Sequence, residues 1–463
     1  MVVYPTYPTC PPTGAWPTFS MEGLSPSQIR LMEAVSSGSN VYCSGMGGTG
    51  KTYMINSIRK LAAAGGLKVA VCAPTGMASF LIEGLTIHRT FRAETGIIPP
   101  YEAKVISFLK DKDIIIVDEI SMCRLDLFEY VIRCIQKTQE ECFMDNYRAA
   151  GRPPFRSTQI KKQILLFGDF GQLAPVLYSH DKSNYLKHFP DGKVFAFNSP
   201  LWEHMGFSEI DLLEVIRQKD QAYIDKLRRV RMGDCEVLRF FRQRQPGSPT
   251  AVTLCTRNET ADSINNRYLD RLNGIWNYPI YIQGSVSNDE IVAEQTLRLA
   301  PGARVIFLTN DKASRWNNGS TGTVLECRED RIIVRKDDGT DVDVERFTWP
   351  VREPAKKRVL TSFGGTPTFV EEDDMKVIGE YSQFPLRLGW AITVHKSQGQ
   401  TLDEVNIADD RFFVEGQLYV ALSRCRSEQG LHILGQLHKS DLLVNEDFLS
   451  FDANIRLYLP RRA

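Results

Sequence analysis

The feature that most constrains the fold of this chain is the segment Gly45–Thr52, GMGGTGKT. It follows the apolar run Val41–Ser44 and precedes a helical pattern, which is the context in which a G-x-x-x-x-G-K-T loop wraps phosphates. Glycines let backbone N–H groups surround the phosphates at a helix N-terminus. The segment therefore requires a strand–loop–helix unit and predicts a bound nucleotide and Mg²⁺. The predicted nucleotide-binding residues here are Gly45, Gly47, Gly48, Thr49, Gly50, Lys51 and Thr52, with the Thr52 hydroxyl on the metal.

Short apolar runs alternate with helical patterns along most of the chain, which is typical of parallel sheets. We predict an α/β fold with two RecA-like parallel-sheet lobes, residues 23–210 and 211–463, after a flexible Pro-rich leader at 1–22. The strands expected in the first lobe are Val41–Ser44, Lys68–Ala73, Asp113–Val117 and Ile164–Phe167. Those expected in the second lobe are Thr250–Thr256, Glu404–Ala408 and His432–Leu434.

Two segments break this alternation and are expected to be insertions. Thr95–Tyr101, TGIIPPY, carries paired prolines that continue neither a helix nor a central strand, so a small projecting insertion is predicted at about residues 92–110. Between about 298 and 386 the pattern becomes all-β, with a hairpin turn expected at Lys336–Gly339. A small β-barrel inserted into the second lobe is predicted there.

Polar residues at strand ends complete a candidate catalytic set. Asp118 and Glu119 end the apolar run that begins at Asp113, so Asp118 is expected to hold Mg²⁺ and Glu119 to activate the attacking water. The Gln172 amide could sense a terminal phosphate. Arg217 and Arg424 are candidates for the arginines that stabilise phosphoryl transfer, although a single helical arginine is more often part of a surface ion pair.

Composition restricts the classes of partner. Lys+Arg and Asp+Glu both number 56, so any nucleic-acid contact must come from a local groove. The run Tyr147–Gly168 is locally basic and is either an accessory DNA contact or a solvated loop. Ten scattered cysteines without a C-x-x-C pair indicate a reducing compartment and no structural metal. The sequence shows no membrane-length apolar run and no secretory or transit signal, so a soluble intracellular protein, in cytoplasm or nucleus, is expected.

The motifs, in this order, resemble those of the PIF-type DNA helicases, in the B branch of helicase superfamily one, with RecD-like proteins as the second resemblance. The match runs from about residue 23 to 435, and its last two motifs are the most specific. The segments that carry it are LSPSQ at 24–28, GMGGTGKT, APTGMAS at 73–79, TIHRTF at 86–91, VDEISM at 117–122, LLFGDFGQLAPV at 165–176, LLEVIRQKD at 212–220, LCTRN at 254–258, NNGSTGTV at 317–324, TVHKSQGQTLD at 393–403 and YVALSR at 419–424.

This resemblance implies a motor that moves 5′→3′ on single-stranded DNA, unwinds forked or tailed duplexes, hydrolyses ATP with Mg²⁺ and acts as a monomer in replication, repair or recombination. It implies that Gln28 contacts adenine, that Gly399 lies at the nucleotide, and that the insertion at 92–110 is the strand-separating wedge. The residues expected along the DNA are Pro74, Thr75, His88, Thr256, Asn258, His395, Lys396 and Ser397.

Two other functions compete with this interpretation. A P-loop ATPase that acts as a switch or remodeller without touching DNA would not need DNA-track residues in both lobes. A DNA-binding scaffold without enzymatic activity would not need the complete set of catalytic candidates. The chain departs from the family pattern between Cys123 and Gln163, where a longer segment replaces a compact turn of the eukaryotic members.

Overall fold

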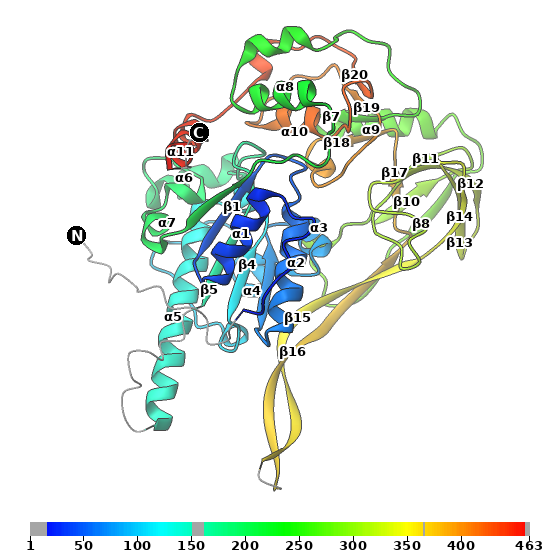
Figure 1. The fold of residues 1–463 in the computed structure, drawn as a ribbon. Helices are drawn as coiled ribbons and strands as arrows, with labels where there is room; N and C mark the ends of the chain where they lie inside the picture. The colour runs from blue at the N-terminus through cyan, green and yellow to red at the C-terminus, as the bar shows by residue number, and fades with distance from the viewer. Residues whose placement is uncertain (1–15, 151–161, 364–365, 459–463) are drawn as a thin grey trace.

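A computed structural model of the chain describes residues 16–150, 162–363 and 366–458, and Figure 1 shows their arrangement. The first lobe is built on a six-stranded parallel sheet. Three of its strands are buried along their whole length, because helices cover both faces of the sheet. The strand order is β3 (Leu85–Thr86), β2 (Val69–Ala73), β4 (Ile114–Val117), β5 (Gln163–Phe167), β1 (Val41–Gly45) and β6 (Ser208–Leu212).

The second lobe contains a four-stranded parallel sheet. Its order is β18 (Ala391–Thr393), β7 (Val252–Cys255), β19 (Val405–Ile407) and β20 (Leu431–Ile433). All seven strands expected from the sequence are present, so the predicted α/β fold is confirmed. The strands β3, β6 and β18 were not expected, and the predicted lobe boundary at residue 210 falls inside β6, which belongs to the first sheet.

Helices connect the strands of both sheets. In the first lobe they are α1 (Pro26–Ser36), α2 (Lys51–Ala64), α3 (Gly76–Leu81), α4 (Ile87–Phe91), α5 (Leu125–Ala150), α6 (Ser179–His188) and α7 (Pro200–Met205). In the second they are α8 (Gln221–Arg231), α9 (Asn258–Leu269) and α10 (Gln417–Ser423). None of the helices in the described ranges combines the length and apolar character needed to cross a bilayer.

The β-rich region lies within the second lobe, as expected, but it is larger than predicted. A five-stranded antiparallel sheet joins β14 (Asp341–Glu345), β13 (Arg331–Lys336), β12 (Thr321–Cys327), β11 (Arg304–Phe307) and β17 (Leu386–Leu388). β8 (Trp276–Pro279) pairs with β10 (Thr296–Leu299) beside it. The hairpin turn at Lys336–Gly339 is confirmed, with Gly339 at φ +86°.

A two-stranded ribbon in this region was not anticipated. β15 (Phe347–Phe363) and β16 (Thr366–Gln383) pair along their length, and the base of β16 also pairs with β9 (Tyr281–Gly284). Figure 1 shows the far end of the ribbon projecting beyond the first lobe, whereas its base lies against that lobe, where Phe80 packs on Phe347.

The insertion at 92–110 does not project freely, contrary to expectation. Ile98 is 5% exposed, and its N–H donates to Asp126 at 2.9 Å on the long helix α5. Ile106 and Leu109 are also buried in the first-lobe core. The apolar side chains of this segment hold it against the lobe, while Tyr101 remains 81% exposed.

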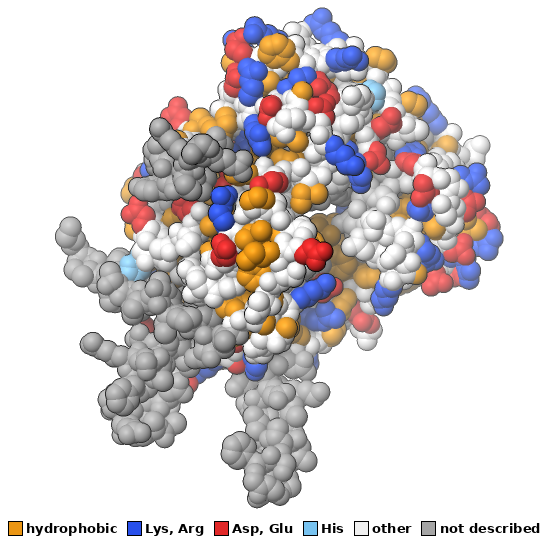
Figure 2. All heavy atoms as spheres, in the orientation of Figure 1, with side chains coloured by type: hydrophobic (Ala, Val, Ile, Leu, Met, Phe, Trp, Pro, Cys, Tyr) orange, Lys and Arg blue, Asp and Glu red, His pale blue; other side chains and the backbone are white. Residues whose placement is uncertain are grey.

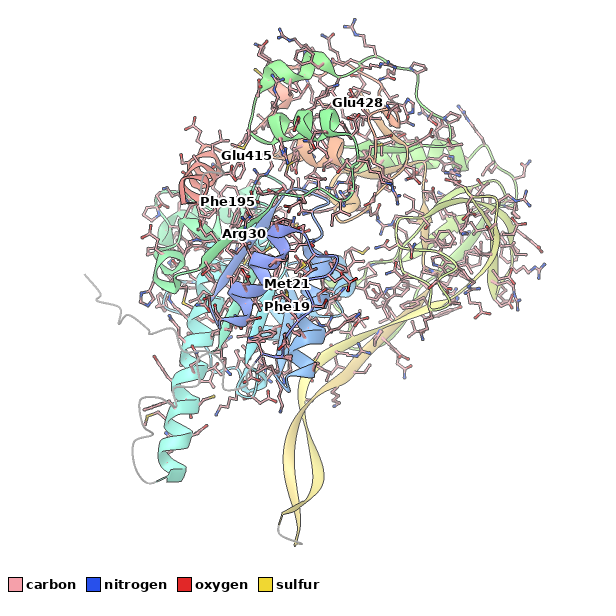
Figure 3. All side chains as sticks on the ribbon, viewed as in Figure 1. Phe19, Met21, Arg30, Phe195, Glu415 and Glu428 are labelled. Carbon is pink, nitrogen blue, oxygen red and sulfur yellow. The ribbon has the colours of Figure 1, made fainter. Side chains whose placement is uncertain are left out.

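The chain returns to the first lobe at its C-terminal end. Helix α11 (Glu446–Tyr458) follows the second sheet, yet Phe448 is buried in the first-lobe core and the Phe451 ring stacks on Phe197 with centroids 4.3 Å apart. The Asn445 Oδ1 accepts the N–H groups of Asp447 and Phe448, which fixes the start of the helix. Its amide nitrogen donates to Glu415 at 3.0 Å, and Figure 3 shows Glu415 between the two lobes. Helix α11 therefore ties the end of the second lobe to the first lobe.

Charge on the surface is mixed. Figure 2 shows Lys, Arg, Asp and Glu side chains interspersed over the visible face. In the basic run, Lys162 is 1% exposed and donates to the carbonyls of Lys110 and Lys112, so it does not contact DNA. Arg148 is exposed and pairs with Glu141 and Asp145. The remaining basic positions of that run, at 152, 156 and 161, lie outside the described residues.

Candidate nucleotide cleft and nucleic-acid channel

The phosphate-binding loop lies between the end of β1 and the start of α2, as its sequence requires. Gly48 and Gly50 have φ of +92° and +87°, where a side chain is strained. A Cβ at Gly48 would also lie 2.4 Å from the Cβ of Arg217, so a second-lobe segment closes over the loop. Lys51 Nζ donates to the carbonyls of Gly45 and Met46 at 2.6 and 3.2 Å. Thr52 is exposed on the first turn of α2, and Thr49 is buried.

The two predicted carboxylates lie directly after β4. Asp118 is 5% exposed and accepts the Glu119 N–H at 2.9 Å. Burial, followed by the neighbouring Glu119 charge, raises the pKa of Asp118 to about 7, and burial also raises the pKa of Glu119. Glu119 has φ +50°, a strained conformation for a residue with a side chain. A bound cation would stabilise this buried negative charge, so the pair fits a divalent metal site.

The two predicted arginines face the phosphate-binding loop. A Cβ built on Gly47 would lie 3.1 Å from an Arg424 nitrogen and 3.6 Å from an Arg217 nitrogen. Burial and the nearby Arg424 lower the pKa of Arg217 to about 9, and burial also lowers the pKa of Arg424, which is 1% exposed. Within the described residues their hydrogen bonds go to Ser423, Val420, Ser397 and Gln400, and neither guanidinium has a carboxylate partner.

A buried network that the sequence did not reveal joins the lobes behind the loop. The Tyr419 hydroxyl on α10 accepts the Gly47 N–H at 3.0 Å and donates to Asp169 at 3.3 Å. Asp169 pairs with Arg231 of α8 at 2.8 Å, and Arg231 also pairs with Asp452 of α11. Burial alone would raise the pKa of Asp169, but the charges of Arg231 and Lys51, together with hydrogen bonds from Arg231 and the Gly171 N–H, outweigh it and hold that pKa below its usual value.

Gln172 and Gln28 both lie at this cleft. Gln172 is 5% exposed, its amide donates to Asp169 at 3.3 Å, and a Cβ on Gly416 would clash with its carbonyl. Gln28 closes a capping box with Ser25 at the start of α1, which places its amide 3.4 Å from a Cβ built on Gly50. Gln28 is therefore held beside the loop, where the adenine contact was expected.

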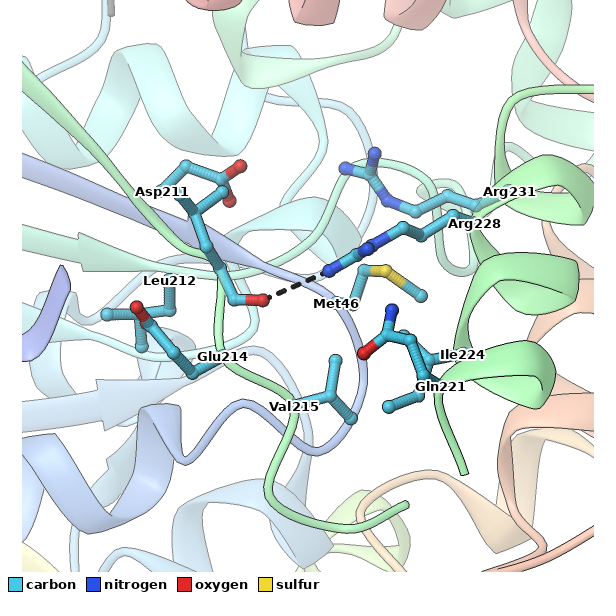
Figure 4. A pocket seen from close by; sticks show the side chains of 10 residues that line it. Met46, Asp211, Leu212, Glu214, Val215, Gln221, Ile224, Arg228 and Arg231 are labelled. Carbon is cyan, nitrogen blue, oxygen red and sulfur yellow. Dashed lines mark hydrogen bonds between the residues drawn. The ribbon is translucent and has the colours of Figure 1, made fainter. Parts of the chain in front are cut away.

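A cavity of about 640 Å³ opens between β6, the loop and α8 (Figure 4). Arg228 crosses it and donates to the carbonyl of Leu213 at 3.2 Å. The cavity separates the first sheet from the first helix of the second lobe, so relative movement of the lobes would change its volume. Its lining is Met46, Asp211, Leu212, Leu213, Glu214, Val215, Gln221, Ile224, Arg228 and Arg231.

A second and larger cavity, of about 800 Å³, carries the predicted first-lobe DNA residues. Pro74, Thr75 and His88 all line it. A bidentate ion pair between Arg89 and Glu290, at 2.5 and 2.7 Å, ties the first lobe to the β-rich region at this cavity. We refer to it below as the nucleic-acid channel.

The DNA-binding candidates of the second lobe do not all line one cavity, in contrast to those of the first lobe. Asn258 and Lys396 line one small pocket near Arg387, and burial lowers the pKa of His395. Ser397 is fully buried and its hydroxyl donates to the Val394 carbonyl, so the structure does not place that side chain on a DNA path. Thr256 is 5% exposed and its hydroxyl bonds to Asp410.

One further contact was missed from sequence. Gln398, next to the candidate DNA residues 395–397, donates from its amide to Glu119 across the cleft at 3.3 Å. Gly399 follows it at φ +79° and is exposed. The carboxylate expected to activate water is thus held by the loop expected to touch DNA.

Comparison with known proteins agrees with this geometry. Residues 24–237 match the model of the family described as PIF1-like helicase. The ATP-dependent DNA helicase Pif1 of Bdellovibrio bacteriovorus is 29% identical, over 95% of this chain and 93% of that protein. The human ATP-dependent DNA helicase PIF1 is 30% identical over 89% of this chain, and the chain spans 60% of its length.

The fold matches as well. The crystal structure of Bacteroides sp Pif1 with ADP-AlF4 superposes with a TM-score of 0.76 at 29% identity, covering 94% of this chain and 97% of that one. The crystal structure of Bacteroides Pif1 bound to single-stranded DNA gives a TM-score of 0.63, at 29% identity over 94% of this chain and 97% of that one. The expected resemblance to PIF-type helicases is therefore confirmed.

Proposed function

We propose that this chain, which is similar to PIF1-like ATP-dependent DNA helicases, moves 5′→3′ along single-stranded DNA and separates forked or tailed duplexes, in replication, repair or recombination. The polarity, the metal and the roles of individual residues are parts of this proposal. We also propose that it acts as a monomer, since both lobes of the cleft come from one chain.

The observation that carries the proposal is the pair of buried arginines above the phosphate-binding loop. Arg217 and Arg424 come from beyond the first sheet, and neither has a carboxylate partner among the described residues. Buried positive charge without a partner is costly, and a polyphosphate would supply the missing negative charge. Binding and hydrolysis of ATP would therefore change how strongly the two lobes attract each other.

The metal has a fitting site. Thr52 and Asp118 would hold Mg²⁺, which when bound neutralises charge on the phosphates. Lys51 would exchange its contacts with Gly45 and Met46 for the β- and γ-phosphates. Glu119 would orient the attacking water and accept its proton, and Arg424 would stabilise the charge that develops on the transferred phosphoryl group.

DNA would lie in the nucleic-acid channel and run on to the second lobe past Asn258, His395 and Lys396. Hydroxyl, amide and imidazole groups grip the backbone without reading sequence, which a moving enzyme requires. A switch ATPase that never binds DNA remains the alternative function. The link from Gln398 to Glu119 favours the motor, because it joins the candidate DNA loop to the hydrolytic carboxylate.

The test is ATP-dependent unwinding of two partial duplexes, one with a 5′ single-stranded tail and one with a 3′ tail. We expect unwinding of the 5′-tailed substrate alone, and its loss in Glu119→Gln. Unwinding from the 3′ tail alone would contradict the proposed polarity. ATP hydrolysis that DNA does not stimulate, with no unwinding of either substrate, would favour the switch.

A further inference from the structure

Two stacked aromatic rings, Tyr178 and His180, lie beside the nucleic-acid channel, and Tyr178 lines it. The rings of Tyr178 and His180 stack with centroids 5.4 Å apart and planes inclined by 11°. Tyr178 is 59% exposed, a large fraction for a ring of this size. Water-exposed, ordered aromatic faces provide a surface on which another planar ring can stack.

The backbone beneath these rings is well anchored. Tyr178 is the N-cap of α6, and its carbonyl accepts the N–H groups of Asp181 and Lys182 at 3.0 and 3.1 Å. The same helix is fixed to the lobe by Tyr185, which is fully buried and donates to the Lys193 carbonyl at 2.5 Å. The ring pair is therefore displayed from a fixed support, and ordering it on binding costs little entropy.

Tyr178 lines the same 800 Å³ channel as Thr75 and His88. Tyr178 follows Gln172 closely in the sequence, so one short segment carries a residue of the nucleotide cleft and a ring of the channel. Neither the family motifs nor the predicted DNA residues include it.

The charges around the ring suit a nucleic-acid strand. Two carboxylates line the channel, Glu290 and Glu353, and both lie near Arg89, which forms a bidentate pair with Glu290. Burial would raise the pKa of Glu290, but the hydrogen bonds from Arg89 and Ser287 together lower it. Arg92 lines the channel as well, and its side chain is exposed. Phosphates can therefore pass Arg92 while bases face Tyr178, the combination of cation and aromatic ring that binds single strands without sequence preference.

We propose that the Tyr178–His180 pair is a base-stacking platform for single-stranded DNA on the wall of the channel that Tyr178 lines. The inference rests on the proposed helicase function and adds to it the contact that holds one base in place.

The test uses the full chain without nucleotide and thymidine oligonucleotides that carry one 2-aminopurine at successive positions. Stacking on an aromatic ring quenches 2-aminopurine fluorescence. We expect wild-type protein to quench the probe strongly at one position, and Tyr178→Ala to abolish that quenching and raise the Kd about fivefold or more. Tyr178→Phe keeps the ring and is expected to retain both. Tyr281 is equally exposed at 59% and packs against Arg346, so Tyr281→Ala is the matched control and is expected to change neither.

The outcomes distinguish this inference from the proposed function. If wild-type protein unwinds DNA while Tyr178→Ala keeps wild-type quenching and Kd, the platform is overturned and the function stands. If Tyr178→Phe loses quenching as fully as Tyr178→Ala, the ring is not the stacking surface. If wild-type protein neither binds single-stranded DNA nor unwinds duplexes, the proposed function fails first.

Discussion

The nucleotide cleft and the nucleic-acid channel both border the first lobe, but Arg217 and α10 close the cleft whereas the β-rich region closes the channel, and the two are built on opposite principles. In the cleft, charged groups are buried: Asp169 is 0% exposed, Arg424 1% and Asp118 5%. In the channel, Tyr178 and Arg92 are exposed, and Thr75 and His88 are half-buried. Buried charges fix the geometry of one reaction, whereas exposed rings and cations accept any base and release it. A motor needs both, and this difference predicts where substitutions cost most.

The largest effect is expected in the cleft. Arg424→Ala should lower the DNA-stimulated ATPase rate by about 10³-fold or more, because we propose that its charge stabilises the transferred phosphoryl group. The measurement is steady-state ATP hydrolysis at saturating DNA. Arg411, whose side chain is 70% exposed, provides the matched control Arg411→Ala, expected to stay within twofold. A loss below tenfold for Arg424→Ala would contradict its assignment.

The buried ion pairs of Arg231 with Asp169 and Asp452, behind the cleft, should contribute strongly to the free energy of unfolding. Arg231→Met leaves Asp169 and Asp452 buried without their cation and should cost about 3–5 kcal/mol of unfolding free energy. Chemical unfolding followed by tryptophan fluorescence measures it. Arg239→Met removes an exposed ion pair, with side chains 67% and 52% exposed, and should cost no more than about 1 kcal/mol. Equal losses of unfolding free energy in the two variants would show that the buried network contributes no more to stability than the exposed ion pair.

The link between the regions is tested at Gln398. Gln398→Ala removes its hydrogen bond to Glu119 and should lower DNA-stimulated ATP hydrolysis about tenfold, since hydrogen bonds to charged groups contribute about 1.5–3 kcal/mol. Gln398→Glu places a second carboxylate there and should lower it further. The Kd for single-stranded DNA is measured in parallel. A change in Kd without a change in hydrolysis would make Gln398 a DNA contact instead.

The smallest effect is expected in the DNA path of the second lobe. Lys396 is exposed, and one phosphate contact contributes a slope of about −0.7 to log K against log salt on single strands. Lys396→Ala should weaken binding several-fold and reduce that slope by this amount. An unchanged slope from 50 to 200 mM salt, which is the range in which such contacts are resolved, would place Lys396 away from the DNA.

Local patterns were predictable from sequence, and long-range contacts were not. The Gly45–Thr52 loop and the strand ends near Asp118 were found because each depends on neighbouring residues. β6 was missed because Ser208–Leu212 alternates polar and apolar side chains at the edge of a parallel sheet. The contacts of Tyr419 with Gly47 and of Gln398 with Glu119 join residues hundreds of positions apart. Lys162 looked basic and accessible, but its ammonium bonds to two carbonyls in the interior.

The central claim is that ATP draws the two lobes together across Arg217 and Arg424. The most direct measurement is the distance between a probe on α2 and a probe on α9, with and without a nonhydrolysable ATP analogue. We predict that the analogue shortens this distance in wild-type protein and leaves it unchanged in an Arg217→Ala/Arg424→Ala double variant that still binds the analogue. The same shortening in the double variant would contradict the account.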